Sequence, residues 1–142
     1  MIALLLASSC TNDKSVLKAS AFNTYLISTC NTTAAPNALY IIMPSYACRG
    51  CITEIFHLLK PRAATPNIII VGVAGTKSGL AGFFTGLETY NICHDTQNAF
   101  IKNFMIEMDK PYYILIEKGR IAQQGSVSPE KLEILEAIIF KI

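Results

Sequence analysis

Residues 38–60 decide the fold, and they read ALYIIMPSYACRGCITEIFHLLK. The stretch opens with an apolar run over 38–43, passes through a turn, and ends in apolar residues at helical spacing. This pattern predicts a strand, a turn and then a helix over 49–60. Two cysteines, Cys48 and Cys51, stand where that helix begins.

The spacing of Cys48 and Cys51 is typical of a pair that passes between dithiol and disulfide. The start of a helix offers unpaired N–H groups and a partial positive charge, which stabilise a thiolate. Arg49 adds a full positive charge beside Cys48. We therefore predict that Cys48 attacks a disulfide and that Cys51, one helical turn on, resolves the mixed disulfide and closes a Cys48–Cys51 disulfide.

The sequence after this helix predicts a sheet with further helices. A second apolar run over 67–73 completes a βαβ unit, whose continuous Ile and Val runs predict parallel strands buried on both faces. The remaining elements are predicted by periodicity and turn signals. We expect strands within 19–29 and over 91–95, an amphipathic helix over 80–87, a short helix over 97–105, a hairpin over 111–124, and a last helix opened by Ser128 and Pro129.

Composition predicts one compact domain. The 142 residues are 51% hydrophobic and 15% charged, which suffices for a real core. The net charge is only +2, and Lys and Arg are scattered, so a nucleic-acid partner is disfavoured. Five cysteines cannot all pair within the chain, and we assign the odd one, Cys10, to other chemistry.

The first ten residues, MIALLLASSC, resemble the end of a bacterial lipoprotein signal peptide. The resemblance implies lipidation at Cys10, with residues 1–18 as signal remnant and tether and 19–142 as the folded domain. The apolar run is too short to span a bilayer and no basic region precedes it, so we expect a truncated signal. The alternative is an apolar strand or helix at the start of a cytosolic protein.

A βαβ unit with Cys-x-x-Cys at the helix start, followed later by a proline that opens a hairpin, resembles the thioredoxin-like fold. More narrowly, residues 111–121, PYYILIEKGRI, look like the Pro-Thr-Thr-Phe-Leu-Ile-Asp stretch of exported thiol-disulfide oxidoreductases of the TlpA and ResA type. The resemblance implies a thioredoxin-like three-layer α/β/α sandwich with a mixed central sheet, over roughly residues 20–142.

The same resemblance implies a site around the cysteine pair. Pro111 is expected to be cis and to lie against the Cys48 sulfur, leaving the Lys110 backbone free to pair with an incoming peptide. Arg49 and Gly50 are also expected to contact that peptide.

Four positions bear on the chemistry that the resemblance implies. Family members commonly carry Trp before the first cysteine and Pro before the second, whereas this chain has Ala47 and Gly50. The buried Asp that assists proton transfer in cytosolic thioredoxins falls at Ile42, so that carboxylate is absent. Asp95 resembles the acidic residue that the group often carries at the end of its third strand.

Several alternatives stay open. The cysteine pair could be a structural disulfide in a non-catalytic binding lipoprotein with the same fold. A zinc site would need Cys93 and His94, but neighbours on a strand point to opposite faces. A peroxidase, suggested by Ser45 three residues before the pair, ranks behind disulfide exchange. Cys30 and Cys93 are either buried thiols or a second disulfide.

The function that these observations predict is thiol-disulfide exchange with periplasmic proteins, without metal or cofactor, in cytochrome maturation or disulfide reduction. We expect a monomeric bacterial lipoprotein on the periplasmic side of a membrane. Its partners are expected to be protein thiols or disulfides and an upstream membrane reductase.

Overall fold

The computed structural model describes residues 17–62, 65–106 and 108–142. Its centre is a mixed five-stranded sheet with the strand order β3-β2-β1-β4-β5. Strands β1, β2 and β3 are parallel, whereas β4 runs antiparallel to β1 and β5 antiparallel to β4. The strands are β1 Ala38–Pro44, β2 Ile68–Val73, β3 Asn91–Asp95, β4 Tyr112–Glu117 and β5 Arg120–Ser126.

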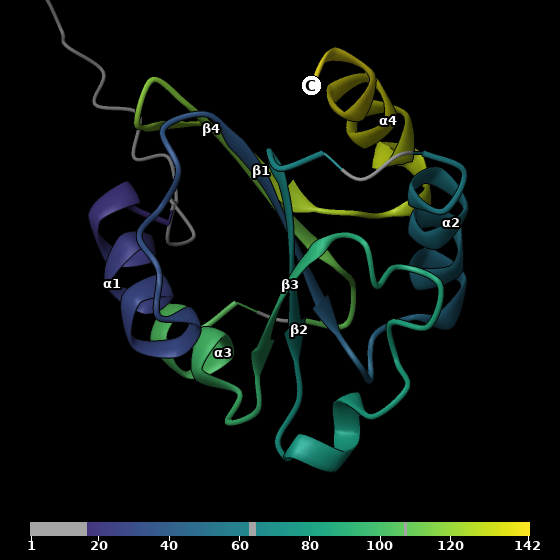
Figure 1. The fold of residues 1–142 in the computed structure, drawn as a ribbon, viewed down its shortest axis with the longest axis horizontal. Helices are drawn as coiled ribbons and strands as arrows, with labels where there is room; N and C mark the ends of the chain where they lie inside the picture. Colours follow the sequence, from purple (N-terminus) through teal and green to yellow (C-terminus); the bar gives the residue numbers. More distant parts are fainter. Residues whose placement is uncertain (1–16, 63–64, 107) are drawn as a thin grey trace, which may run out of the picture.

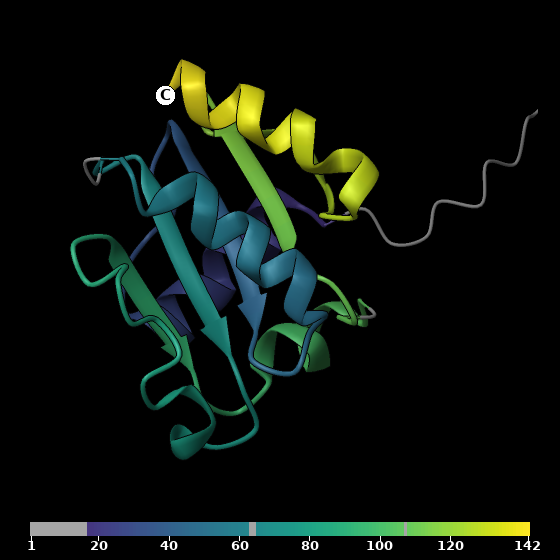
Figure 2. The same ribbon diagram turned by 90° about the vertical axis from the view of Figure 1, so that its right-hand side faces the viewer.

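Helices cover both faces of the sheet. The pair α1 (Ala19–Cys30) and α3 (Ala99–Phe104) lies on one face, and the pair α2 (Arg49–Leu59) and α4 (Leu132–Lys141) on the other (Figure 1). In Figure 2, α2 and α4 lie side by side in front of the sheet. The predicted three-layer α/β/α sandwich with a mixed sheet is therefore confirmed.

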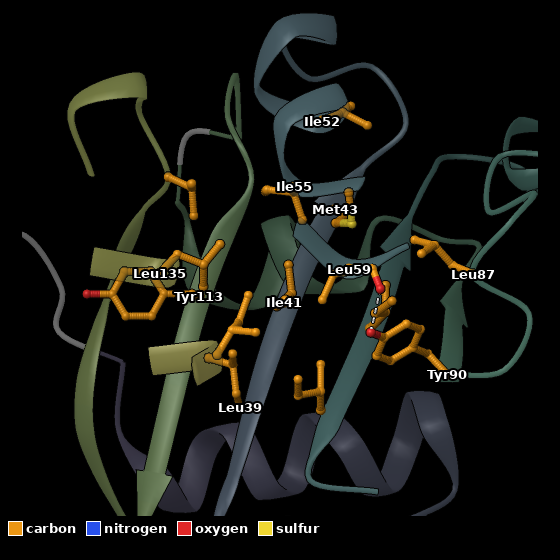
Figure 3. Close-up of a cluster of buried hydrophobic side chains, with 14 of the residues drawn as sticks. Leu39, Ile41, Met43, Ile52, Ile55, Leu59, Leu87, Tyr90, Tyr113 and Leu135 are labelled. Carbon is orange, nitrogen blue, oxygen red and sulfur yellow. Dashed lines mark hydrogen bonds between the residues drawn. The ribbon is translucent and has the colours of Figure 1, made fainter. Parts of the chain in front are cut away.

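Strand β1 is buried along its whole length because each face meets a helical layer. Leu39, Ile41 and Met43 belong to the apolar cluster of α2 and α4, whereas Tyr40 and Ile42 belong to that of α1 and α3. Figure 3 shows the first cluster, to which α2 contributes Ile52, Ile55 and Leu59. Successive residues of β1 therefore pack against opposite helical layers, and each of them is apolar or aromatic.

The expected strand within 19–29 is wrong, because this segment forms helix α1. Its buried residues are Phe22, Tyr25 and Leu26, at the i, i+3, i+4 spacing of one helical face. Asn31, in the left-handed conformation at φ 54°, ends the helix. The helical spacing of these three residues is present in the sequence.

The expected amphipathic helix over 80–87 is also wrong. A short 3₁₀ helix, Lys77–Leu80, is followed by a series of turns. Gly82 and Gly86 have φ values of +68° and +92°, which no α-helix accepts. Phe84 still reaches the core, because a Cβ on Gly72 would lie 2.5 Å from its ring.

The last third of the chain agrees with expectation. Lys118 and Gly119 form the hairpin turn, with φ values of 52° and 74°. A short 3₁₀ helix, Pro129–Lys131, follows Ser128 and leads directly into α4. Among the residues that the structure describes, no helix has the length and apolarity needed to cross a membrane.

Candidate functional site

The site lies at the edge of the sheet where β1 ends and β4 begins. Register pairs Ile42 of β1 with Tyr112 of β4, so the residues before β4 lie next to the turn that follows β1. The Cys48 N–H donates a hydrogen bond to the Asp109 carbonyl at 3.0 Å. Antiparallel pairing therefore brings the segment before β4 next to the cysteine pair.

Cys48 is the N-cap residue of α2 and is exposed, whereas Cys51 lies in the first turn and is buried. The pKa of Cys48 is lowered by a hydrogen bond from the Cys51 thiol, then by the backbone N–H groups of Cys51 and Gly50. The predicted stabilisation of a thiolate by the start of this helix is thus present in the geometry.

Burial raises the pKa of Cys51, and the neighbouring Cys48 raises it further. The two thiols therefore differ in role: the exposed one carries the negative charge more readily, and the buried one keeps its proton. Both cysteines are free, so the expected Cys48–Cys51 disulfide is not formed in this structure.

Lys110 supplies the positive charge at the site. Its ammonium lowers the pKa of Cys48 and of Cys51. The sequence suggested Arg49 for this effect, but Arg49 is exposed in the first turn of α2 and its charge is not among the causes of either shift. Among the described residues, none forms a backbone hydrogen bond with Lys110.

Pro111 differs from the expectation in one respect. No cis peptide bond occurs among the described residues, so the Lys110–Pro111 bond is trans and the expected cis bond is wrong. The trans form is favoured by about 0.5–1 kcal/mol for an X–Pro bond unless the surroundings select cis. Pro111 is buried, and its carbonyl accepts a hydrogen bond from the Val127 N–H at 2.7 Å.

A pocket of about 350 Å³ opens between the starts of α2 and α4 and contains the cysteine pair. Glu54 lines it, three residues after Cys51 on the same helix. Residues at i and i+3 share a helix face, so this spacing in the sequence could have identified Glu54. The pocket wall is Cys48, Gly50, Cys51, Glu54, Val127, Ser128, Pro129 and Leu132.

At Ile42, where cytosolic thioredoxins carry a buried Asp, β1 supplies no carboxylate near the cysteine pair. The Ile42 side chain is fully buried in the apolar cluster with α1 and α3. Proton transfer to or from Cys51 must therefore involve another group, and the Glu54 carboxylate lines the pocket that the pair occupies.

Asp95 has a structural role at the end of β3. It is buried and accepts hydrogen bonds from the Tyr25 hydroxyl at 3.0 Å and from the Ala99 and Phe100 N–H groups at 3.0 and 2.8 Å. The carboxylate thus holds the first turn of α3 and joins it to α1. Every one of these partners belongs to the protein scaffold rather than to the cysteine site.

Cys30 and Cys93 form a disulfide, which settles a choice that the sequence left open. The bond joins the last residue of α1 to β3, with 5.5 Å between the Cα atoms. Cys93 is therefore not available to complete a zinc site with the pair, and the His94 ring stacks on Phe84 instead. Cys10, the expected lipidation site, lies outside the described residues.

The Lys110 charge leads to a test. Lys110→Gln is expected to raise the pKa of Cys48 and to move the pH profile of its alkylation by iodoacetamide to higher pH. Because only the thiolate reacts, alkylation at mildly acidic pH should be slower than in the unchanged protein, and the rates should converge at high pH, where Cys48 is deprotonated in both proteins. Arg49→Gln is the matched control. An equal shift in both variants would show that the effect is not specific to Lys110.

Comparison with known proteins supports the fold. No protein-family model matches the chain, and no curated protein matches its sequence. Three solved structures superpose on about three quarters of it. The first is a candidate thiol:disulfide interchange protein DsbE from Chlorobium tepidum, with 17% identity and a TM-score of 0.54, and the match covers 74% of this chain and 78% of that one. The second is a secreted Mycobacterium tuberculosis disulfide oxidoreductase homologous to E. coli DsbE, with 12% identity and a TM-score of 0.55, covering 75% of this chain and 82% of that one. The third is a thioredoxin-like protein from Aeropyrum pernix, with 13% identity and a TM-score of 0.50, covering 76% of this chain and 80% of that one. At these identities the similarity concerns the fold, and the chain adopts the thioredoxin-like α/β fold.

Proposed function

We propose that this protein exchanges disulfides with other proteins through Cys48 and Cys51. The observation that carries the proposal is the asymmetry of the pair: an exposed thiol with a lowered pKa caps a helix, and a buried thiol with a raised pKa lies one turn inside. A purely structural disulfide does not require this difference between its two cysteines, whereas an attacking thiol and a resolving thiol do.

The proposed exchange consists of two successive displacements at sulfur. The Cys48 thiolate attacks a partner disulfide, one partner sulfur leaves as a thiolate and takes a proton, and a mixed disulfide forms. Cys51 then loses its proton, which Glu54 or water accepts, and attacks the Cys48 sulfur. The pair ends as a disulfide and the partner as a dithiol, so two electrons have moved to the partner.

A reductant must return the pair to the dithiol if the protein acts as a reductase. We propose a membrane reductase that supplies two electrons by the same exchange. The reverse direction, oxidation of a partner dithiol by the Cys48–Cys51 disulfide, uses the same steps, and reduction potential decides between them.

We further propose that the protein works on the periplasmic side of a bacterial membrane, as a monomer held by a lipid on Cys10. The Cys30–Cys93 disulfide supports an oxidising compartment, because such bonds persist in exported proteins and are rare in the cytosol. The start of the sequence up to Cys10 supports the lipid anchor. Metabolic labelling with a fatty acid, with Cys10→Ser as control, tests the anchor.

The reduction potential of the pair tests the exchange itself. The Cys30→Ser/Cys93→Ser variant is equilibrated with mixtures of a dithiol and its disulfide, and alkylation of Cys48 measures the reduced fraction. We expect a reduction potential above about −300 mV, which is the range of reactive disulfides. A lower potential, with no reduction of insulin, would favour the non-catalytic binding lipoprotein with a structural disulfide.

A further inference from the structure

The pocket that contains the cysteine pair has an acidic group in its wall. Cys48, Cys51 and Glu54 follow one another at three-residue spacing along the start of α2, and all three line the pocket. Residues with this spacing share a helix face, and the Cα–Cβ bonds of a helix tilt toward its start, so the Glu54 side chain leans toward the two thiols. Among the described residues of the wall, Glu54 is the only acidic or basic side chain apart from these thiols.

The opposite side of the pocket is largely apolar. It belongs to the segment that enters α4, which lies beside α2 (Figure 2). Val127 is buried there, and its N–H donates the hydrogen bond to the Pro111 carbonyl that fixes this segment next to the cysteine site. Pro129 and Leu132 continue the apolar wall. The volume of about 350 Å³ lies at the lower end of the range of about 300–1,000 Å³ for small-molecule sites, so the pocket suits a small ligand.

Gly50 leaves space in this pocket beside the attacking sulfur. A Cβ at position 50 would lie 3.8 Å from Cys48 Sγ, which is van der Waals contact. A larger side chain would extend this contact into the space that a ligand sulfur needs. With glycine at this position, a small disulfide can approach Cys48 from within the pocket.

The charges in the wall favour a ligand with a positive group. The Cys48 thiolate and the Glu54 carboxylate are both negative and belong to the same wall. Lys110 lowers the pKa of both thiols, but it is not among the described residues that line the pocket. An ammonium group in the pocket is therefore attracted by Glu54, whereas a carboxylate there is repelled.

We propose that this pocket binds low-molecular-weight disulfides that carry an ammonium group on a short carbon chain, with the ammonium beside Glu54 and a sulfur beside Cys48. This inference rests on the proposed exchange reaction and adds a class of substrate to it. The Cys48 thiolate attacks one sulfur, and the other leaves as an aminothiolate that takes a proton. Cys51 then loses its proton and displaces the second aminothiol from Cys48, so one disulfide becomes two thiols while the pair becomes a disulfide.

Three small disulfides of different charge test this selectivity. Cystamine is cationic, bis(2-hydroxyethyl) disulfide is neutral and dithiodipropionate is anionic. The reaction is followed in Cys51→Ser, where Cys48 can only form the mixed disulfide and Glu54 has no Cys51 proton to accept. Mass spectrometry of the Cys48 peptide measures the rate for each reagent, and the rate with the neutral disulfide corrects for the reactivity of Cys48.

Glu54→Gln in this background is expected to lower the corrected cystamine rate about two- to fivefold, the range of an exposed ion pair. The same change should raise the corrected rate with the anionic disulfide. Added salt should reduce the difference between Glu54 and Gln, because it screens exposed charges.

Glu133→Gln is the matched control. Glu133 is exposed in the first turn of α4 and is not part of the described pocket wall, so this variant removes the same charge and should leave the corrected rates unchanged. Glu54→Asp keeps the charge and should retain part of the preference for cystamine.

The outcomes separate the inference from the proposed function. Equal corrected cystamine rates with Glu54 and with Gln would overturn the pocket as a site for cationic disulfides, while the exchange would stand. Two peptide disulfides that differ only in lysine or glutamine beside the cysteine test the other source of a cation. A Glu54-dependent preference for the lysine peptide, without one for cystamine, would assign the charge to a partner polypeptide and overturn the inference. No mixed disulfide with any reagent would overturn the exchange itself, and the inference with it.

Discussion

Cys48→Ser is expected to lower insulin reduction to the uncatalysed rate, because a serine hydroxyl supplies no thiolate to attack a disulfide. Cys51→Ser is expected to stop turnover at a different step. Cys48 still attacks, but nothing resolves the product, so about one partner per molecule should accumulate as a mixed disulfide. Non-reducing electrophoresis after an alkylating quench measures both results.

Comparison of Cys51→Ser with Cys51→Ala tests why Cys48 is reactive. The hydrogen bond from the Cys51 side chain is the largest cause of the lowered pKa of Cys48. Serine keeps a donor at this position and alanine removes it. Alkylation of Cys48 at mildly acidic pH should therefore be slower in Cys51→Ala, because its raised pKa leaves less thiolate below the ordinary titration range of a thiol.

A contrary pattern would be informative. If Cys48→Ser accumulated mixed disulfides and Cys51→Ser did not, the buried thiol would be the attacking group. If neither variant trapped a partner and both reduced insulin like the unchanged protein, the pair would have no part in exchange. Either result would contradict roles assigned from exposure and pKa.

The central part of this fold could be predicted because its local patterns and its packing agree. The apolar run of β1, the turn and the helical spacing of α2 indicate the same βαβ unit. Because β1 is buried on both faces, its continuous apolar run agrees with its packing. In α1 the patterns disagree: Phe22, Tyr25 and Leu26 have helical spacing, whereas residue types suggested a strand. Tertiary packing decided in favour of the helix.

The cysteine pair could be found from spacing alone, but its surroundings could not. Lys110 reaches the pair only because β4 runs antiparallel beside β1, which is a long-range fact. Glu54 is predictable from helical spacing, because it lies three residues after Cys51 on the same helix. The sequence left the pairing of Cys30 with Cys93 open, because it depends on a contact between the end of α1 and β3, 63 positions away along the chain.

Removal of the Cys30–Cys93 disulfide is expected to have the largest effect on stability. The two residues are 63 positions apart, and closing a loop of that length lowers the entropy of the unfolded chain by an amount worth about 4 kcal/mol at 25 °C. Domains of this size unfold with about 5–15 kcal/mol in total. Cys30→Ser/Cys93→Ser should therefore lose a large share of its stability, seen as a lower urea midpoint without reductant.

The double variant Cys48→Ser/Cys51→Ser is the matched control for this measurement. Both of these cysteines are free in the structure, and a bond between them would close a loop of only a few residues, so their replacement should lower the midpoint much less than loss of Cys30–Cys93. Adding a dithiol reductant that opens Cys30–Cys93 should bring the unchanged protein down to the level of Cys30→Ser/Cys93→Ser. The variant itself should not respond, because it has no bond between α1 and β3 to lose. Equal midpoints without reductant would mean that the Cys30–Cys93 bond does not constrain the unfolded chain and would contradict the prediction.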